Sequence, residues 1–269
     1  GRRRAAGWLL AGLLAVVAAL GLAPGVRAQD TIHVTPDGSG DGSSWASPTN
    51  LQNALSVAVS GDEIWVAGGV YTPGVTAEAT FTVTSGIQLY GGFAATETVR
   101  TQRDWVANLT ILSGDIGGDD VSVGDVVTTT ANIVGANAYH VLWLDGVDGD
   151  PITTTTRIDG FTITAGTATL GTYPHINGGG LYCAGNGSGN ECSPTVANVT
   201  FSGNAAIGGG AMYNHGFMSG VSNPSLVNVL FAGNAATVNH GGAMYNYGIV
   251  GVSSPSLVNV TFTDNTAAG

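Results

Sequence analysis

The sequence contains no lysine and only seven arginines, against 18 aspartate and glutamate residues. Four of the arginines lie within residues 1–28, a segment that holds no acidic residue. Without that segment the net charge is 3 − 18 = −15. A chain with this charge does not attract nucleic acid or anionic lipid. We therefore expect neither nucleic acid nor an anionic membrane surface as a partner.

Residues 1–28 combine three features in order: the arginines Arg2–Arg4, an apolar run from Trp8 to Leu22, and a small-residue end at Ala28. This order predicts a secretory signal peptide over residues 1–28, with the exported chain starting at Gln29. The alternative is a transmembrane helix, although the run is short and interrupted by glycine. We expect one domain over 29–269, without a membrane span, located outside the cell, on its surface or at an outer membrane.

A sustained helical period is also lacking. Instead, residues 159–269 repeat themselves, and the Phe-x-x-Asn phenylalanines are 30 and 31 residues apart (231 − 201, 262 − 231). Such self-similarity indicates one structural unit stacked on copies of itself. The repeated segments are Gly-Gly-Ala-Met-Tyr-Asn at 209–214 and 241–246, Pro-Ser-Leu-Val-Asn-Val at 224–229 and 255–260, and Phe-x-x-Asn at 201–204, 231–234 and 262–265.

Within one unit the residues alternate with the period of a strand. Strict alternation places Leu226 on one face with Asn228, and Val229 on the other face with Phe231. Short strands and turns in about 30 residues predict one coil of a parallel β-helix. Stacked coils would align the phenylalanines in an internal column, Tyr213 over Tyr245 in another, and the asparagines in a hydrogen-bonded ladder. The alternative for the asparagines is an ordinary turn role. The predicted structural ladder comprises Phe201, Phe231, Phe262, Asn204, Asn234 and Asn265.

Phe-x-x-Asn together with Gly-Gly-Ala-x resembles the repeat of polymorphic outer membrane proteins and, more broadly, of bacterial proteins with a pectin-lyase-like fold. Met212 and Met244 stand where that family usually has Ile, Leu or Val. The resemblance implies an all-β, right-handed parallel β-helix. Residues 50–59 followed by Gly61-Asp-Glu-Ile-Trp-Val look like the family's N-terminal capping helix and first coil. Because Gly269 lies within a further unit, we expect a C-terminal part to be missing.

The only two cysteines, Cys183 and Cys192, are nine residues apart. In an exported chain this spacing favours a disulfide across the intervening loop. Two free thiols or a metal site are the alternatives. The spacing is not Cys-x-x-Cys, so a redox role has little support.

Asp, Glu, Lys and Arg are absent between Cys192 and Thr263, so the clearest repeats carry no carboxylates and no arginine or lysine for acid–base catalysis. Carboxylates cluster earlier, and Arg157 lies beside the second group. Solvated loops, calcium ligands and catalytic carboxylates are all compatible with this clustering. We expect His175, His215 and His240 to be turn or surface residues, and the tyrosines to form either a sugar-stacking strip or a structural ladder. The calcium candidates are Asp115, Asp119, Asp120, Asp145, Asp148 and Asp150.

These observations predict an exported β-helix scaffold that is adhesin-like or binds a glycan. Its expected partner is an extracellular polysaccharide or a host or matrix surface. We expect no catalytic residue and no cofactor, with structural calcium left open. The alternative function is a polysaccharide lyase or glycoside hydrolase with the same fold. A third is a passive surface-layer component.

Overall fold

The computed structural model describes residues 29–269, so the predicted signal peptide at 1–28 lies outside the described residues. The described chain is mostly β-structure, and the pairs between its labelled strands are all parallel. It contains one α-helix, α1 (Leu51–Val57), and two short 3-10 turns, η1 (Arg100–Gln102) and η2 (Thr130–Asn132).

The strands form three sheets. The ten-stranded sheet comprises β1 (Thr31–Val34), β2 (Glu63–Ala67), β3 (Gly69–Tyr71), β5 (Gln88–Phe93), β6 (Thr110–Ser113), β8 (Arg157–Asp159), β9 (Thr162–Thr164), β12 (Thr195–Ser202), β15 (Ser225–Ala232) and β18 (Ser256–Thr263). The five-stranded sheet comprises β4 (Phe81–Val83), β7 (Leu142–Asp145), β11 (Leu181–Ala184), β14 (Met212–His215) and β17 (Met244–Tyr247). The four-stranded sheet comprises β10 (Thr167–Ala168), β13 (Ala205–Ala206), β16 (Ala235–Ala236) and β19 (Thr266–Ala267).

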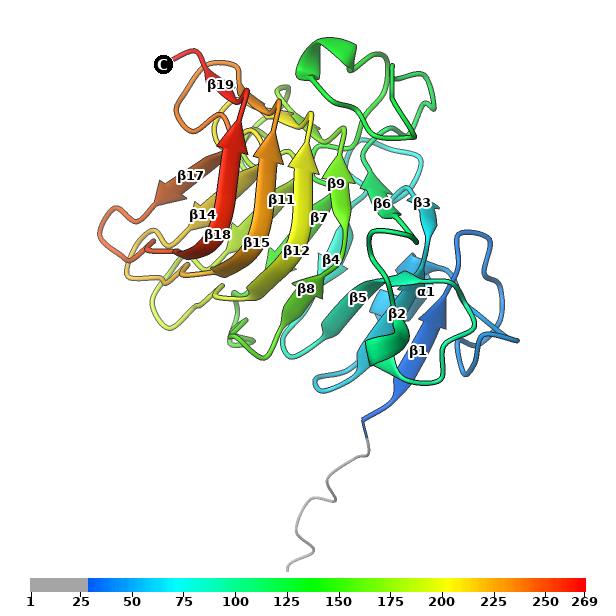
Figure 1. The fold of residues 1–269 in the computed structure, drawn as a ribbon. Helices are drawn as coiled ribbons and strands as arrows, with labels where there is room; N and C mark the ends of the chain where they lie inside the picture. Colours follow the sequence, from blue (N-terminus) through cyan, green and yellow to red (C-terminus); the bar gives the residue numbers. More distant parts are fainter. Residues whose placement is uncertain (1–28) are drawn as a thin grey trace, which may run out of the picture.

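The chain passes through these sheets in a fixed order. The series β11–β12–β13 is followed by β14–β15–β16 and by β17–β18–β19, and each strand pairs with its equivalent in the preceding series. In Figure 1, β12, β15 and β18 lie side by side, with β11, β14 and β17 behind them. One sequence repeat therefore corresponds to one passage through three parallel sheets.

Phenylalanine rings stack along the inside of the ten-stranded sheet. Phe201, Phe231 and Phe262 are register partners in β12, β15 and β18. The centroids of the first two rings are 4.9 Å apart and those of the last two 5.0 Å, with 4° between the planes in each pair. Phe201 and Phe231 are fully buried. Each such ring stabilises the fold by roughly 1.5–3 kcal/mol through burial alone.

A buried asparagine ladder runs beside the rings. The side-chain oxygen of Asn234 accepts hydrogen bonds from the backbone N–H and the side-chain amide of Asn204, at 2.9 and 3.0 Å. Asn265 accepts the equivalent pair from Asn234, at 3.1 and 2.8 Å. The amide of each asparagine also donates to a backbone carbonyl, as Asn234 does to Phe201. The asparagine side chains thus form hydrogen bonds with buried backbone groups of neighbouring passages. A hydrophobic side chain at the same position would leave those backbone groups unpaired.

The alternation expected within a repeat is wrong at its centre. Leu226 lies in the core together with Val229 and Phe231, whereas Val227 is only half-buried. The cause is Asn228, whose φ of +56° lies in the left-handed region and interrupts the register between β12 and β15. One left-handed residue bends the strand and reverses the alternation after it. Asparagine tolerates this conformation better than most residues.

The predicted helix near the N-terminus is present as α1. The side chain of Asn50 caps it by accepting a hydrogen bond from the backbone N–H of Asn53, at 2.9 Å. Leu51, Ala54 and Leu55 are buried in the main core, where the helix packs against β1, β2 and β4. None of the helices among residues 29–269 is long and apolar enough to cross a membrane.

Candidate functional site

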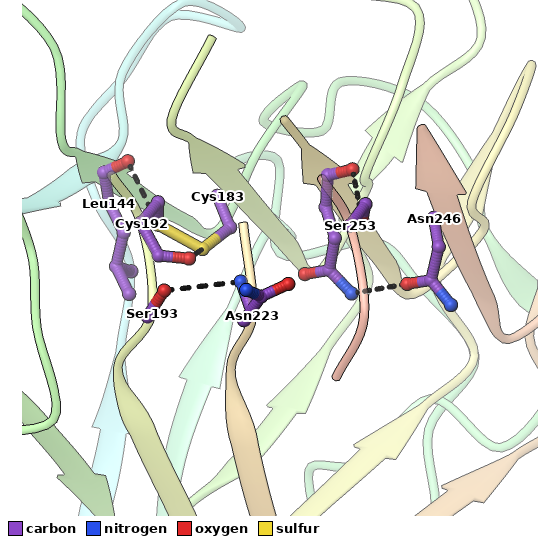
Figure 2. The surroundings of a disulfide bond; sticks show 8 residues. Leu144, Cys183, Cys192, Ser193, Asn223, Asn246 and Ser253 are labelled. Carbon is purple, nitrogen blue, oxygen red and sulfur yellow. Dashed lines mark hydrogen bonds between the residues drawn. A yellow bond between two sulfur atoms is a disulfide. The ribbon is translucent and has the colours of Figure 1, made fainter. Parts of the chain in front are cut away.

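Cys183 and Cys192 form a disulfide that closes the loop after β11. Figure 2 shows it in the same row as polar side chains of the next two passages. Asn214 and then Asn246 occupy the register position of Cys183, and the side-chain amide of Asn214 donates to Asn246 at 2.7 Å. Ser253, beside Asn246, donates to the backbone carbonyl of Asn214 at 3.1 Å. The disulfide therefore links two buried positions, and in the next two passages the equivalent positions hold polar residues that form hydrogen bonds. Its role is structural.

The loop after β6 brings Asp115, Asp119 and Asp120 together, with one carboxylate oxygen of each within 4.8 Å of the others. Backbone N–H groups of the same loop donate to both oxygens of Asp115. Burial raises the pKa of Asp120, although hydrogen bonds from Val134 and Asn137 partly oppose the shift. Three carboxylates suit a hard cation such as Ca²⁺. Calcium binding here stays a prediction, which a calcium titration followed by thermal unfolding would test.

The other three calcium candidates do not join that cluster. Asp145 ends β7, and one of its oxygens is buried without a hydrogen-bond partner in the described structure. Asp148 and Asp150 are exposed in the turn that follows. Among residues 29–269, the only group of three or more ligand-type side chains close enough to share an ion is the one at Asp115.

The tyrosine column lies on the opposite face of its sheet from the main core. Tyr213 pairs in register with Tyr182 and Tyr245, and the ring centroids are 5.4 and 5.5 Å apart. Trp143 stacks on Tyr182 at 4.4 Å. Tyr182 is only 1% exposed, so a polysaccharide cannot stack on it. The prediction that these tyrosines form an internal column is wrong about the face, because alternate residues of β11 point to opposite sides of the sheet.

A hydrogen-bonded cluster covers this column. The hydroxyls of Tyr173 and Tyr182 and the Nδ1 atom of His215 lie 2.9–3.0 Å from one another. Burial lowers the pKa of His215 to about 4, so the imidazole is neutral near pH 7. The expectation that His215 is a turn or surface residue is therefore wrong: β14 carries it into a buried position. The cluster fastens the segment around Tyr173 onto the five-stranded sheet.

Two further histidines meet nearby. The Nδ1–H of His140 donates to the carbonyl of Gly178 at 3.0 Å, which leaves Nε2 as the acceptor for Nδ1 of His175 at 3.3 Å. Burial lowers the pKa of His140 to about 4, an effect that the Gly178 bond partly opposes. Nothing in the sequence around His140 distinguishes it from a surface residue. His240, in contrast, is exposed as expected.

A second asparagine ladder, not expected from the sequence, crosses the outside of the ten-stranded sheet. Asn198, Asn228 and Asn259 each have φ between +52° and +56°. The side-chain amide of Asn228 donates to Asn198 at 3.1 Å, and that of Asn259 donates to Asn228 at 2.8 Å. The amide of Asn198 donates to the carboxylate of Asp159 at 2.8 Å. This outer ladder therefore begins at a charged residue of β8.

Asp159 is a firmly ionised carboxylate. Burial by itself would raise its pKa, but hydrogen bonds from Arg103, Asn198 and Arg157 outweigh burial and lower it. Arg103 donates to Oδ1 at 2.7 Å, and Arg157 approaches Oδ2 at 2.8 Å. A general acid of a glycosidase needs the opposite shift, a raised pKa. Asp159 is therefore an organising residue and not an acid catalyst.

An open groove of about 350 Å³ lies beside the outer ladder. Trp105 forms one wall; its side chain is 38% exposed, and the guanidinium of Arg103 lies 4.8 Å from the ring centroid. Asp104 fixes the backbone after it, because its carboxylate accepts hydrogen bonds from Val106 and Ala107, each 3.0 Å long. The other wall presents amides, hydroxyls and an aliphatic residue from three successive passages: Thr162, Asn198, Thr200, Asn228 and Leu230.

Comparison with protein-family models, with curated proteins and with solved structures found no match for this chain.

Proposed function

We propose that this chain is an exported right-handed parallel β-helix that binds a glycan along the outer face of its ten-stranded sheet. The groove beside Trp105 carries the proposal. An exposed indole ring offers a flat apolar surface for the C–H groups of a sugar, and neighbouring amides and hydroxyls offer hydrogen bonds to its hydroxyls. The strands of successive passages lie about 4.8 Å apart, so the polar wall continues along a chain-like ligand.

Three further observations support this proposal. The repeats stack in register through three parallel sheets, as expected for a β-helix with a pectin-lyase-like fold and Phe-x-x-Asn repeats. The disulfide between Cys183 and Cys192 suits an oxidising compartment outside the cytosol. The predicted signal peptide indicates the same route. A rigid stack of this kind suits an adhesin-like scaffold at a cell surface.

The alternative, a polysaccharide lyase or glycoside hydrolase, has weaker support. Among the described residues, the acidic cluster at Asp115 includes no arginine, while Asp159 has its carboxylate committed to two arginines and an asparagine. Cleavage needs a group that can give or take a proton at the glycosidic bond or the sugar ring. Asp159, whose carboxylate is ionised and fully hydrogen-bonded, is a poor proton donor, and the residues that line the groove include no carboxylate.

The test is binding of the purified protein to a panel of neutral and acidic oligosaccharides, measured by isothermal titration calorimetry. We expect Trp105→Ala to weaken binding at least tenfold at a temperature where circular dichroism shows that the variant is folded; its melting temperature should fall, because part of the ring is buried and Arg103 packs against it. Leu170→Ala is the matched control, because Leu170 is an exposed apolar residue outside the groove. Retained affinity in Trp105→Ala would reject the groove, and new reducing ends or unsaturated uronates in the same mixtures would favour the enzymatic alternative.

A further inference from the structure

Every arginine of residues 29–269 lines the same pocket. Arg100, Arg103 and Arg157 surround an open cavity of about 530 Å³ on the outer face of β5 and β8, which Gln88 and Tyr90 also line. The described chain otherwise carries 18 acidic residues and no lysine, so this pocket is its one concentration of permanent positive charge. It adjoins the Trp105 groove through Arg103, which contacts Trp105 and Asp159.

Arg103 has a structural role in this pocket. Its side chain is 9% exposed, and Nη1 donates to the backbone carbonyls of Gly91 and Asp159 at 2.9 and 3.1 Å. Nη2 donates to the Asp159 carboxylate at 2.7 Å. The guanidinium lies 5.1 Å from the centroid of the Tyr90 ring. With these partners Arg103 joins β5 to β8 and forms the floor of the pocket.

Arg157 and Arg100 each use one edge of the guanidinium on protein partners and expose the other edge to solvent. Arg157 uses Nε and Nη2 on Asp159, and its side chain is 34% exposed. Arg100 uses Nη1 on the carboxylate of Glu63 and on the hydroxyl of Tyr90, and its side chain is 42% exposed. A guanidinium has five N–H donors. Nη1 of Arg157, and Nε and Nη2 of Arg100, have no protein partner among residues 29–269.

The partners hold these donors in place without cancelling the charge. Three arginines face two carboxylates, Glu63 and Asp159, which leaves a local charge of 3 − 2 = +1. Tyr90 and Asp159 are register partners, as are Gln88 and Arg157, so adjacent strands set the spacing of the pocket wall. At physiological salt, fields from the acidic residues elsewhere are screened beyond roughly 8 Å. An anion at the pocket therefore meets mainly these arginines.

We propose that the pocket binds an oxyanion, the carboxylate or sulfate group of an acidic glycan. The planar, fixed guanidinium groups of Arg100 and Arg157 match such a group and pair with it more strongly than a neutral donor does. Gln88, Thr154 and Thr155 line the same pocket and offer hydrogen bonds to the sugar that carries the charge. The identity of the carrier rests on the proposed glycan-binding function, whereas oxyanion binding itself does not.

The first experiment compares oligogalacturonate, its methyl ester and a chondroitin sulfate oligosaccharide of similar length by calorimetry. We expect one or both acidic ligands to bind at least fivefold tighter than the ester, with affinity falling as salt rises. Comparison of the oligogalacturonate with the chondroitin sulfate oligosaccharide then shows whether the pocket prefers a carboxylate or a sulfate group. Arg100→Gln should remove this preference, because Arg100 is exposed and supplies an open donor edge.

A pair of charge-matched variants gives the opposite change. Glu63→Gln frees Arg100 from its counter-ion and should tighten acidic-ligand binding severalfold. Asp264→Asn changes the net charge by the same amount at an exposed position outside the pocket and should have no such effect. Equal affinity for the ester and the acids, or equal effects of the two variants, would overturn the proposal.

A small-anion arm separates this inference from the glycan-binding proposal. Titration with galacturonate and with sulfate should shift the NMR signals of the Arg100 and Arg157 Nε–H groups, which are assigned by their loss in Arg100→Gln and Arg157→Gln, and galactose should not. If oligosaccharides fail to bind but these signals shift, the groove proposal fails and the oxyanion site stands. If oligosaccharides bind and the signals stay unmoved, the groove stands and the oxyanion site is rejected.

Discussion

Phe231→Ala tests the stacking register most directly. The Phe231 ring is fully buried and lies between Phe201 and Phe262, 4.9 and 5.0 Å from their ring centroids. Truncation removes the buried ring and leaves a cavity, which costs about 3–5 kcal/mol of unfolding free energy. The two lost ring pairs, worth about 0.5–1.5 kcal/mol each, fall within that total.

Phe262→Ala is the matched comparison within the same column. The comparison applies to purified protein consisting of residues 29–269, in which Phe262 has one ring neighbour and is 47% exposed. Because only about half of the residue is buried, we expect the substitution to lower the unfolding free energy by about half as much, about 1.5–2.5 kcal/mol. The difference between the two variants measures the cost of removing a ring from the middle of the stack.

Urea unfolding and thermal unfolding, both followed by circular dichroism, measure the two variants under the same conditions. For a chain of this size, each kcal/mol lowers the melting temperature by about 2–4 °C, so Phe231→Ala should melt about 6–20 °C lower. A Phe231→Ala variant that loses no more stability than Phe262→Ala would refute the reasoning. Such a result would mean that the central ring gains nothing from its second neighbour.

Three other perturbations have defined outcomes. Asn234→Ala should cost about 2 kcal/mol or more, because it removes the acceptor of the buried Asn204 backbone N–H and the side-chain donor to the Phe201 carbonyl, and unchanged urea unfolding would contradict this. Replacing Cys183 and Cys192 together by alanine should cost about 2–3 kcal/mol, since a short loop is no longer closed in the unfolded chain; equal stability of the variant and the oxidised protein would count against it. Stability should fall as pH drops from 6.5 towards 4, because the unfolded state protonates its histidines at pH values where His140 and His215, with pKa values lowered to about 4 by burial, stay neutral. In urea titrations at several pH values, His215→Gln should flatten this dependence, and an unchanged slope would exclude His215 as a contributor.

Much of the fold could be predicted because the spacing of the repeat along the sequence determines which residues lie next to one another in the stacked units. Phenylalanines spaced by nearly equal intervals must meet when identical units stack, and Phe201, Phe231 and Phe262 do so. The inner asparagines follow for the same reason, since they keep a constant offset from each phenylalanine. The alternation within a unit could not be predicted, because it depends on the backbone angle of Asn228, and asparagine occurs in ordinary strands as well as in left-handed bends.

The candidate site was much less predictable. Arg100 and Arg157 are separated by more than fifty residues of sequence and meet only because β5 pairs with β8 and η1 folds back over that face. Trp105 reaches the groove through a turn fixed by Asp104. No repeat covers these residues, so their spacing in the sequence contains no information about their proximity. The burial of His140 and His215 likewise depends on how the segment around Tyr173 packs.

The arrangement at Asp159 bears on whether the arginine pocket is only structural. A single buried carboxylate needs one well-placed arginine to be stabilised, and Arg103 meets that need with its side chain almost fully buried. Arg157 adds a second cation to the same carboxylate and keeps part of its guanidinium in solvent. Arg100 brings a third guanidinium to the pocket, where it pairs with Glu63 and lies 4.6 Å from the centroid of the Tyr90 ring, and residues 29–269 contain no other arginine or lysine. Exposed ion pairs stabilise a fold by only about 0–1 kcal/mol. The contribution of the two exposed arginines to stability is therefore small, and their gathering in one pocket supports the proposal that the pocket binds an anion.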